Sequence, residues 1–384
     1  MKNFKSLFYT NHLLSSLTSS IFLPTPLNIN YMWNFGSMLG IFLVIQIVSG
    51  LFLSMHYCPN IENAFSSVSY IMKDVKSGWL IRLIHMNGAS FYFILIYAHI
   101  LRGMFYCSFK LANVWIVGST IMFLSMATAF LGYVLPWGQM SFWGAMVITN
   151  LLSAIPYVGK MIVEWLWGGF SINNSTLNRF FSLHFILPLI IMILVMVHLM
   201  VLHISGSSNP VHSKLNVYKI VFHPYYVIKD LITIFVVLFI FMIVNLQTPY
   251  LFSDPDNFKM ANPMITPLHI KPEWYFLFAY SILRSIPNKL GGVIMLFMSI
   301  FMLYLLPMMN QNSMKNLKFY PMNQYLYWMF VNNIVILTWL GAKAIEPPFI
   351  ELNGIFTFLY FFYYTFSFFL SNFSDLLLGK RNES

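Results

Sequence analysis

Long apolar stretches alternate with shorter polar connections along the whole chain. Seven stretches of more than twenty residues contain no Asp, Glu, Lys or Arg, among them those between Lys110 and Lys160 and between Glu351 and Asp375. A bilayer core about 30 Å thick is crossed by about 20 apolar helical residues, and a helix satisfies its own backbone groups. The pattern therefore predicts eight membrane-spanning helices, at 32–53, 79–104, 114–134, 178–204, 229–247, 289–308, 321–341 and 348–369.

Composition excludes several other classes of protein. Hydrophobic residues make up 59% of the 384 positions and charged residues 8%, against about 25% charged in a typical soluble domain. The two cysteines, Cys58 and Cys107, are too few for a disulfide scaffold. The net charge is +10, but the cations stand singly between apolar runs. This is typical of loops that flank membrane spans and not of a nucleic-acid surface.

The fold class that follows is an all-α, polytopic membrane protein. The N-terminal sequence MKNFKSLFYTNHLL has the features of neither a signal peptide nor a transit peptide. An even number of spans puts both chain ends on one membrane face, called side one here; the opposite face is side two. Two connections on side two, at 135–177 and 248–288, are long enough to carry function.

Four histidines lie inside predicted spans, where an ionisable group is costly and usually functional. His85 and His99 are separated by fourteen positions, and so are His184 and His198. Fourteen helical residues rise about 21 Å and return to within about 40° of the starting face. Each of the two helices therefore carries one histidine near each membrane surface, on the same side of the helix.

The two histidine-bearing helices run in the same direction, because one round trip of the chain separates them. His85 is therefore expected level with His184. His99 is expected level with His198. Two opposed imidazoles suit a six-coordinate haem iron, whereas a zinc site needs four ligands. No Cys-x-x-Cys-His sequence occurs, so the pattern predicts two haems held non-covalently.

Glycines on the neighbouring helices repeat the same spacing. Gly36 and Gly50 stand fourteen positions apart in the first predicted helix, as do Gly118 and Gly132 in the third. A glycine inside a helix costs about 1 kcal/mol relative to alanine. A flat macrocycle pressed against the helix backbone explains why four glycines stand at this register.

Two arginines complete the pattern. Arg82 precedes His85 by three residues, and Arg102 follows His99 by three, so each lies on the surface side of its histidine. A guanidinium pairs well with haem propionates. Either arginine alone also fits a side chain that reaches from a helix end to the membrane surface.

The chain resembles the cytochrome b family, the membrane subunit of the quinol–cytochrome c reductase (respiratory complex III), along essentially its whole length. The matching strings are WNFGSMLG (33–40), HMNGASFYFILIYAH (85–99), GYVLPWGQMSFWGA (132–145), RFFSLHFILP (179–188), FHPYYVIKDL (222–231) and KPEWYFLFAYSILRSIPNKLGG (271–292). The resemblance implies a di-haem four-helix bundle in residues 1–210. It implies a four-helix region in residues 211–384 that completes the quinone pockets.

A proton acceptor is needed where quinol is oxidised, because that reaction releases two protons. Glu273 is the candidate: it lies on side two, at the edge of an apolar run, level with His85 and His184. A partly buried carboxyl group has a raised pKa, which suits it to accept and pass on a proton. We assign catalytic roles to Glu273, Tyr275 and Tyr133. The resemblance implies a pocket wall formed by Phe130, Tyr133, Gly144, Ile148, Glu273, Phe276 and Tyr280.

The resemblance implies a second pocket, for quinone reduction, on side one near His99 and His198. Its residues are Trp33, Asn34, Ser37, His203, Ser207, Lys229 and Asp230. His203 and Asp230, together with a water molecule, could supply protons to the quinone. The chain departs from the pattern of the family in this region, with Ile204 in place of an acidic residue and Ser208 in place of asparagine.

The resemblance also implies a mechanism and partners. Ubiquinol oxidised on side two gives one electron to an iron–sulfur protein and the other, through a low-potential haem at His85 and His184 and a high-potential haem at His99 and His198, to quinone on side one. This electron path contributes to a proton gradient. The implied partners are the iron–sulfur protein, cytochrome c1 and other subunits of complex III, in a homodimeric complex. The implied location is the mitochondrial inner membrane, with both termini on the matrix side.

Other classes of function remain open on the residues alone. A membrane transporter or pump could use the histidines as a proton relay, but such proteins carry polar residues at the membrane midplane. A haem–copper oxidase subunit would need three further histidines as copper ligands. A scaffold subunit would need neither the histidine nor the glycine spacing.

Overall fold

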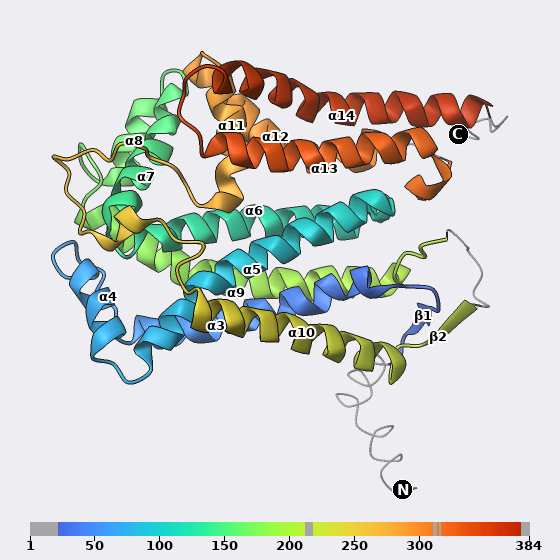
Figure 1. Ribbon diagram of the computed structural model, residues 1–384, viewed down its shortest axis with the longest axis horizontal. Coiled ribbons are helices and arrows are strands. Elements are labelled where there is room, and N and C mark those ends of the chain that lie inside the picture. The colour runs from blue at the N-terminus through green and yellow to red at the C-terminus, as the bar shows by residue number, and fades with distance from the viewer. Residues whose placement is uncertain (1–21, 212–217, 310–312, 315, 378–384) are drawn as a thin grey trace, which may run out of the picture.

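The computed structural model describes residues 22–211, 218–309, 313–314 and 316–377. Within these residues the chain is all-α apart from one two-stranded ribbon, as Figure 1 shows, which confirms the predicted fold class. The long helices are α3 (Phe35–Ser54), α5 (Gly78–Phe105), α6 (Ala112–Val134), α9 (Asn174–Ser205), α10 (Tyr225–Gln247), α12 (Lys289–Met309), α13 (Pro321–Gly341) and α14 (Phe349–Leu377).

These long helices coincide with the eight predicted spans, and α13 has the predicted bounds. Among the described residues, seven of them are long and apolar enough to cross a membrane, and α13 is not one of these. Its buried Asn323 faces a neighbouring helix: the amide donates to the Ser367 carbonyl at 3.0 Å and to the Ser371 hydroxyl at 2.6 Å, both on α14. A membrane-spanning helix tolerates polar side chains where they form hydrogen bonds with neighbouring helices.

Short helices gather at side two, the end of the bundle where α4, α7 and α8 lie in Figure 1. They are α4 (Ala64–Lys73), α7 (Gln139–Asn150), α8 (Gly159–Trp167) and α11 (Leu277–Ser285). Short 3-10 helices complete the connections: η1 (Tyr31–Asn34), η2 (Ser108–Lys110), η3 (Leu151–Ala154), η5 (Pro255–Phe258), η6 (Trp274–Phe276) and η7 (Leu317–Phe319).

The ribbon lies at side one, the opposite end of the bundle (Figure 1). Its strands β1 (Pro24–Pro26) and β2 (Lys219–Val221) are antiparallel, with Thr25 opposite Ile220. The chain ends lie outside the described residues, and so do the predictions about the N-terminal segment and about the side that holds the termini.

Four helices form the centre of the molecule: α6 packs along α9, α3 packs along α5, and α3 also contacts α9. Helix α10 covers α3 and α5 on one flank, while α11, α12, α13 and α14 cover the other flank (Figure 1). The predicted domain boundary at 210/211 falls between α9 and β2. It stays a prediction, although β1 and β2 join residues from both sides of that boundary.

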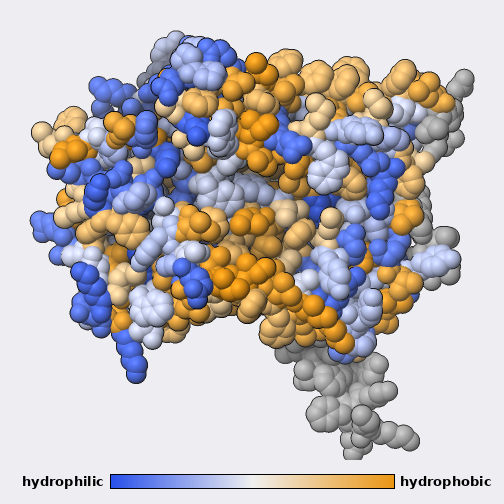
Figure 2. Space-filling view, viewed as in Figure 1, coloured by the Kyte–Doolittle hydropathy of each residue, from blue (hydrophilic) through white to orange (hydrophobic). Residues whose placement is uncertain are grey.

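Hydrophobic side chains dominate the middle of the surface in Figure 2, and hydrophilic side chains gather toward its two ends. Helices α9 and α10 bury little of their surface within the chain. Apolar side chains along helices that span a membrane face lipid at no cost in free energy, so this surface agrees with the membrane class that composition indicates.

Helix α9, which carries two of the histidines, begins at a well-defined cap. The side chain of Asn173 accepts from the backbone N–H groups of Ser175 and Thr176, and the Thr176 hydroxyl accepts from the Asn173 N–H. This reciprocal arrangement satisfies orphan donors of the first turn. The cap sets the register of α9 eleven residues before His184.

A polar pair fastens α14 to α11 and gives a test of the packing. The Ser281 hydroxyl donates to the Asn353 side chain, whose amide donates back to the Ser281 carbonyl at 2.9 Å. Asn353→Ala should destabilise the protein by about 1–2 kcal/mol, because the buried hydroxyl and carbonyl groups of Ser281 each lose a hydrogen bond. The midpoint of thermal denaturation in detergent measures the loss.

The adjacent Gly354 supplies the control, because nothing lies within 4 Å of a Cβ added there. Gly354→Ala should leave the denaturation midpoint unchanged or raise it slightly, since alanine is the better helix former. Equal losses in the two variants would contradict the assignment of Asn353 as a packing contact.

Candidate functional site

The four histidines meet as two pairs between α5 and α9. The ring centres of His85 and His184 are 6.2 Å apart, with ring planes at 85°. The ring centres of His99 and His198 are 6.5 Å apart, with ring planes at 61°. The structure thus joins the residues that the repeated spacing predicts to be level, one pair toward each membrane face.

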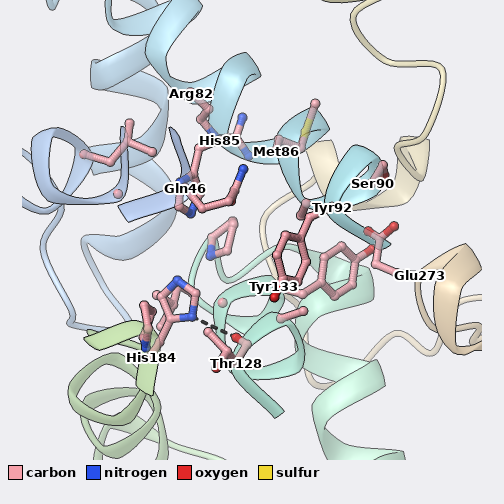
Figure 3. Close-up of a pocket in the computed structure, with 18 of the residues that line it drawn as sticks. Gln46, Arg82, His85, Met86, Ser90, Tyr92, Thr128, Tyr133, His184 and Glu273 are labelled. Carbon is pink, nitrogen blue, oxygen red and sulfur yellow. Dashed lines mark hydrogen bonds between the residues drawn. The ribbon is translucent and has the colours of Figure 1, made fainter. Parts of the chain in front are cut away.

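Outer hydrogen bonds fix how the two imidazoles of the side-two pair are turned. His184 Nδ1 lies 2.8 Å from the Thr128 carbonyl on α6, a contact drawn in Figure 3. A carbonyl only accepts, so Nδ1 carries the proton and Nε2 keeps its lone pair. His85 Nδ1 lies 2.9 Å from the Ser49 hydroxyl on α3. Partners of this kind orient metal-ligating histidines.

The spacing of each pair fits an iron ion between the two imidazoles. Metal–nitrogen bonds of about 2 Å, with each ring nitrogen about 1.1 Å from its ring centre, separate two opposed ring centres by about 6 Å. Both measured separations agree with that value. No group of three or more His, Cys, Asp or Glu side chains that could hold a metal forms among the described residues. Two imidazoles per metal, with a macrocycle supplying the remaining ligands, therefore match the donors that this part of the chain offers.

The four glycines lie against the imidazoles, each beside a different histidine. A Cβ at Gly132 would stand 2.3 Å from His184 Cε1, and one at Gly118 would stand 3.0 Å from His198 Cε1. A Cβ at Gly50 would be 3.0 Å from His85 Cε1, and a Cβ at Gly36 would be 3.6 Å from His99 Cε1. The glycine register therefore has a second reason besides a macrocycle: a side chain at Gly132 would clash with the histidine, and one at Gly118 or Gly50 would press tightly against it.

Buried donors without a partner surround the pairs. They are Gln46 Nε2 near the side-two pair, and Trp33 Nε1 and Arg102 Nε near the side-one pair. The guanidinium of Arg102 stands 5.1 Å from the Trp33 ring centre, and one of its N–H groups lies 3.1 Å from His99 Nδ1. A buried donor left unpaired costs about 1–3 kcal/mol. Carboxylates of a haem would satisfy donors of this type.

A cavity of about 500 Å³ surrounds the side-two pair and extends to Tyr133 and Glu273. Arg82, His85 and Gln46 line one part of it, as Figure 3 shows, while Tyr133 and Glu273 line another. The volume is in the range of cofactor and ligand sites, and most of the lining is apolar. The predicted proton acceptor and one predicted haem site therefore share a cavity.

A small second cavity, of about 20 Å³, lies on the other side of Glu273. It brings together six of the seven residues predicted to form the quinol pocket wall: Phe130, Tyr133, Gly144, Ile148, Glu273 and Phe276. The seventh, Tyr280, lies one turn further along α11, and its hydroxyl donates to the Ile270 carbonyl at 3.2 Å. Tyr133 and Glu273 line both cavities and so stand between the histidine pair and the predicted pocket.

The carboxyl group of Glu273 lies outside the spanning helices, just before η6. Burial raises its pKa to about 7, and the hydrogen bond from the Tyr133 hydroxyl opposes that rise. Asp254 nearby also raises the pKa, and Lys271 lowers it. A pKa near neutral pH is the property of a group that accepts and releases protons at the pH of a cell.

On side one, four of the predicted reduction-pocket residues meet where η1 and α3 cross α10. The amide of Asn34 donates to the Lys229 carbonyl at 3.1 Å, and the Ser37 hydroxyl donates to the Asn34 carbonyl at 2.9 Å. The Ser37 side chain also lies near the Asp230 carboxyl group. His203 is exposed, and among the described residues no hydrogen bond or ion pair joins it to Asp230.

Several residues of the site lie outside the predicted set. Ser49 and Thr128 orient the two histidines of the side-two pair, and Gln46 brings an unpaired amide to the same cavity. Gln46 and Ser49 lie within one turn of Gly50 on α3, so a search for polar residues next to the glycine register would find them. Thr128 acts through its backbone carbonyl, which every residue carries, and so leaves no signal in the sequence.

Comparisons with known proteins agree on one family. The family model described as "Cytochrome b/b6/petB" matches residues 20–206, and the model described as "Cytochrome b(C-terminal)/b6/petD" matches residues 260–361. A protein described as "Cytochrome b" from Apis mellifera ligustica is 64% identical over 378 residues, which cover 98% of each chain.

A solved structure gives the same result. A chain of the structure described as "Hyperthermophilic respiratory Complex III" matches with a TM-score of 0.88 at 34% identity. The match covers 91% of this chain and 94% of that one. The ranges of the two family models include both histidine pairs and the segment that carries Glu273.

The close contact between Gly132 and His184 gives a prediction for haem binding at the side-two pair. In Gly132→Ala the new methyl group would stand 2.3 Å from His184 Cε1, so the imidazole must turn away from His85. We expect this variant to lose about half of the haem absorbance per chain, because one of two predicted ligand pairs is displaced.

Gly40 on α3 is the matched control, because nothing lies within 4 Å of a Cβ placed there. Gly40→Ala should keep the full haem absorbance of the purified protein. Equal absorbance in the two variants would show that the position of the His184 ring does not decide haem binding.

Proposed function

The chain belongs to the cytochrome b family, and we propose that it is the subunit of a quinol–cytochrome c reductase that oxidises quinol on one membrane face and reduces quinone on the other. One observation carries this proposal: the same two helices hold an opposed imidazole pair toward each face. A single metal site, or a site at the midplane only, would not link the two faces.

His85 and His184 would hold one haem on side two, and His99 and His198 a second on side one. When bound, these haems supply one-electron carriers of low and high potential between the two faces. Thr128 and Ser49 orient the imidazoles on side two. The guanidinium groups of Arg82 and Arg102 would pair with the propionates, as the unpaired Nε of Arg102 supports.

Glu273 would accept a proton from the quinol hydroxyl, with Tyr133 holding the carboxyl group in place. This role of Glu273 is supported by its pKa of about 7 and by its position between the two cavities. The ring of Tyr275 would be held rigidly next to Glu273, because it stacks on the Phe93 ring with centres 4.1 Å apart. The remaining wall of the pocket is proposed to be Phe130, Gly144, Ile148, Phe276 and Tyr280.

Quinone reduction is proposed on side one, where protons must be delivered to both carbonyl oxygens. Asp230, which lies near Ser37, and the exposed His203 would donate them through water. Lys229 would neutralise the negative charge that develops, and Trp33, Asn34 and Ser207 would form the rest of the pocket. Proton release on side two and proton uptake on side one together move charge across the membrane.

The partners and location are part of the same proposal. The iron–sulfur protein and cytochrome c1 would take the electron that does not cross the membrane, within a homodimeric complex of further subunits. Membership of the family and likeness to a respiratory complex III support this assembly. We propose ubiquinone as the substrate and the mitochondrial inner membrane as the location, with the termini on the matrix side; the 64% identity to an insect cytochrome b supports the mitochondrial location.

The raised pKa of Glu273 predicts a pH profile. The protonated form of Glu273 cannot accept a proton, so the rate of quinol oxidation should rise as pH increases through about 7, where the carboxyl group ionises. Glu273→Gln should remove this acid limb and lower the rate at pH 8 by roughly a hundredfold. Steady-state turnover of the purified complex between pH 5.5 and about 8.5 measures both effects.

Glu62→Gln is the control, because Glu62 is an exposed carboxyl group on side two. That variant should keep the full pH profile. An acid limb that persists in Glu273→Gln would assign the proton acceptor to another group.

A further inference from the structure

The chain between η5 and η6 is tied to the beginning of α7. We call residues 259–272 the strap, because this segment leads to Glu273 across side two. The backbone of Gln139 donates to the Lys259 carbonyl at 3.0 Å, and the N–H of Ala261 donates to the Trp137 carbonyl at 3.0 Å. These two bonds form a short antiparallel bridge between the strap and the LPWGQ sequence.

The side chain of Gln139 adds two more bonds to the strap. Its carbonyl oxygen accepts from the N–H of Asn262 at 2.7 Å, and its amide donates to the Ile265 carbonyl at 3.0 Å. The residue is 8% exposed. Both ends of a buried amide are thus satisfied by the strap alone, and each such bond is costly to lose.

The far end of the strap is tied as well. The Tyr280 hydroxyl donates to the Ile270 carbonyl at 3.2 Å, and the ammonium group of Lys271 lies 3.3 Å from the Asp254 carboxylate. These contacts lie three and two residues before Glu273. Residues 262–269, the part of the strap between the Gln139 bonds and these contacts, form no helix or strand.

Prolines stiffen the path from Gln139 to Glu273. Each of Pro263, Pro267 and Pro272 holds its own φ at about −65° and restricts the residue before it. The prolines therefore restrict how the strap can bend between the Gln139 bonds and Glu273. A shift of about 1 Å in a catalytic group can cost a hundredfold in rate.

We propose that Gln139 is a positioning residue for quinol oxidation, whose buried amide holds the strap and so sets where Glu273 stands beside Tyr133. This inference rests on the proposed role of Glu273 as proton acceptor. Gln139 touches neither of the two cavities described above, so its effect acts through the strap. The LPWGQ sequence thereby gains a role that the pocket wall does not give it.

The groups that act on the Glu273 carboxyl come from every element around it. Tyr133 on α6 bonds it, Tyr275 on η6 interacts with it, Asp254 before η5 disfavours its ionisation, and Lys271 on the strap favours it. Burial remains the largest cause of its raised pKa. A loosened strap would admit water, so the pKa of Glu273 would fall toward its ordinary value.

The experiment measures turnover of the assembled complex against pH and against quinol concentration. Gln139→Met keeps the length of the side chain and removes both amide bonds. We expect kcat to fall by about tenfold, the KM for quinol to stay within about twofold, and the acid limb to move to lower pH by roughly half a unit or more. Haem absorbance should be unchanged, since Gln139 contacts none of the four histidines.

Thr149→Val is the matched control on the same helix. Thr149 is buried and bonds the Ala145 carbonyl and the Trp167 indole, with no hydrogen bond to the strap. This variant should keep kcat and the acid limb of the wild type. An equal change in both variants would make the effect a general loosening of α7 and overturn the proposal.

Gln139→Asn is the milder second variant, because it keeps a polar amide at this position but is one methylene shorter than the side chain that makes both bonds to the strap. A downward shift of the acid limb supports the proposal, and it decides the matter should Gln139→Met fail to assemble. Wild-type kcat and pH profile in an assembled Gln139→Met, or a raised KM with unchanged kcat, overturns it. An acid limb that survives Glu273→Gln in the same series would instead remove the proposed role of Glu273 itself.

Discussion

The opposed imidazole pairs between α5 and α9 are the constraint on which the other features of the molecule depend. A polar ring inside a membrane is costly unless it is bonded, and each pair must also stand at a separation that suits a shared metal. The repeated histidine spacing on two parallel helices places one such pair at each membrane face. The cap of α9, the glycines of α3 and α6 and the outer hydrogen bonds of His85 and His184 help to keep the rings in this arrangement.

The neighbouring helices are shaped by the same pairs. Gly132 and Gly118 give the histidines of α9 room against α6, and Gly50 does the same for His85 against α3. Thr128 and Ser49, on these two helices, supply the partners for the outer nitrogens of the side-two pair. Helix α10 packs against α3 and α5 on one flank, and α12 and α13 pack against α6 and α5 on the other.

The sequence predicts periodic features well and non-periodic ones poorly. The eight spans and the pairing of His85 with His184 follow from hydropathy and helical spacing, and the structure agrees with both. The bond from His184 to the Thr128 carbonyl could not be foreseen, because any residue offers a carbonyl. The ties from Gln139 to the strap join segments far apart in the chain without any repeat. Tyr280 was predicted in the pocket wall, and the contact found for its hydroxyl is to the strap.

The central claim is that the chain carries two haems, one at each histidine pair. The most direct test is a redox titration of the α-band absorbance of the purified protein, with the haem quantified as its pyridine haemochrome. The paired histidines predict two b-type haems per chain that titrate at two separate potentials. A single haem would leave one pair without a ligand role and break the path between the faces. The absence of haem would contradict the assignment of all four histidines.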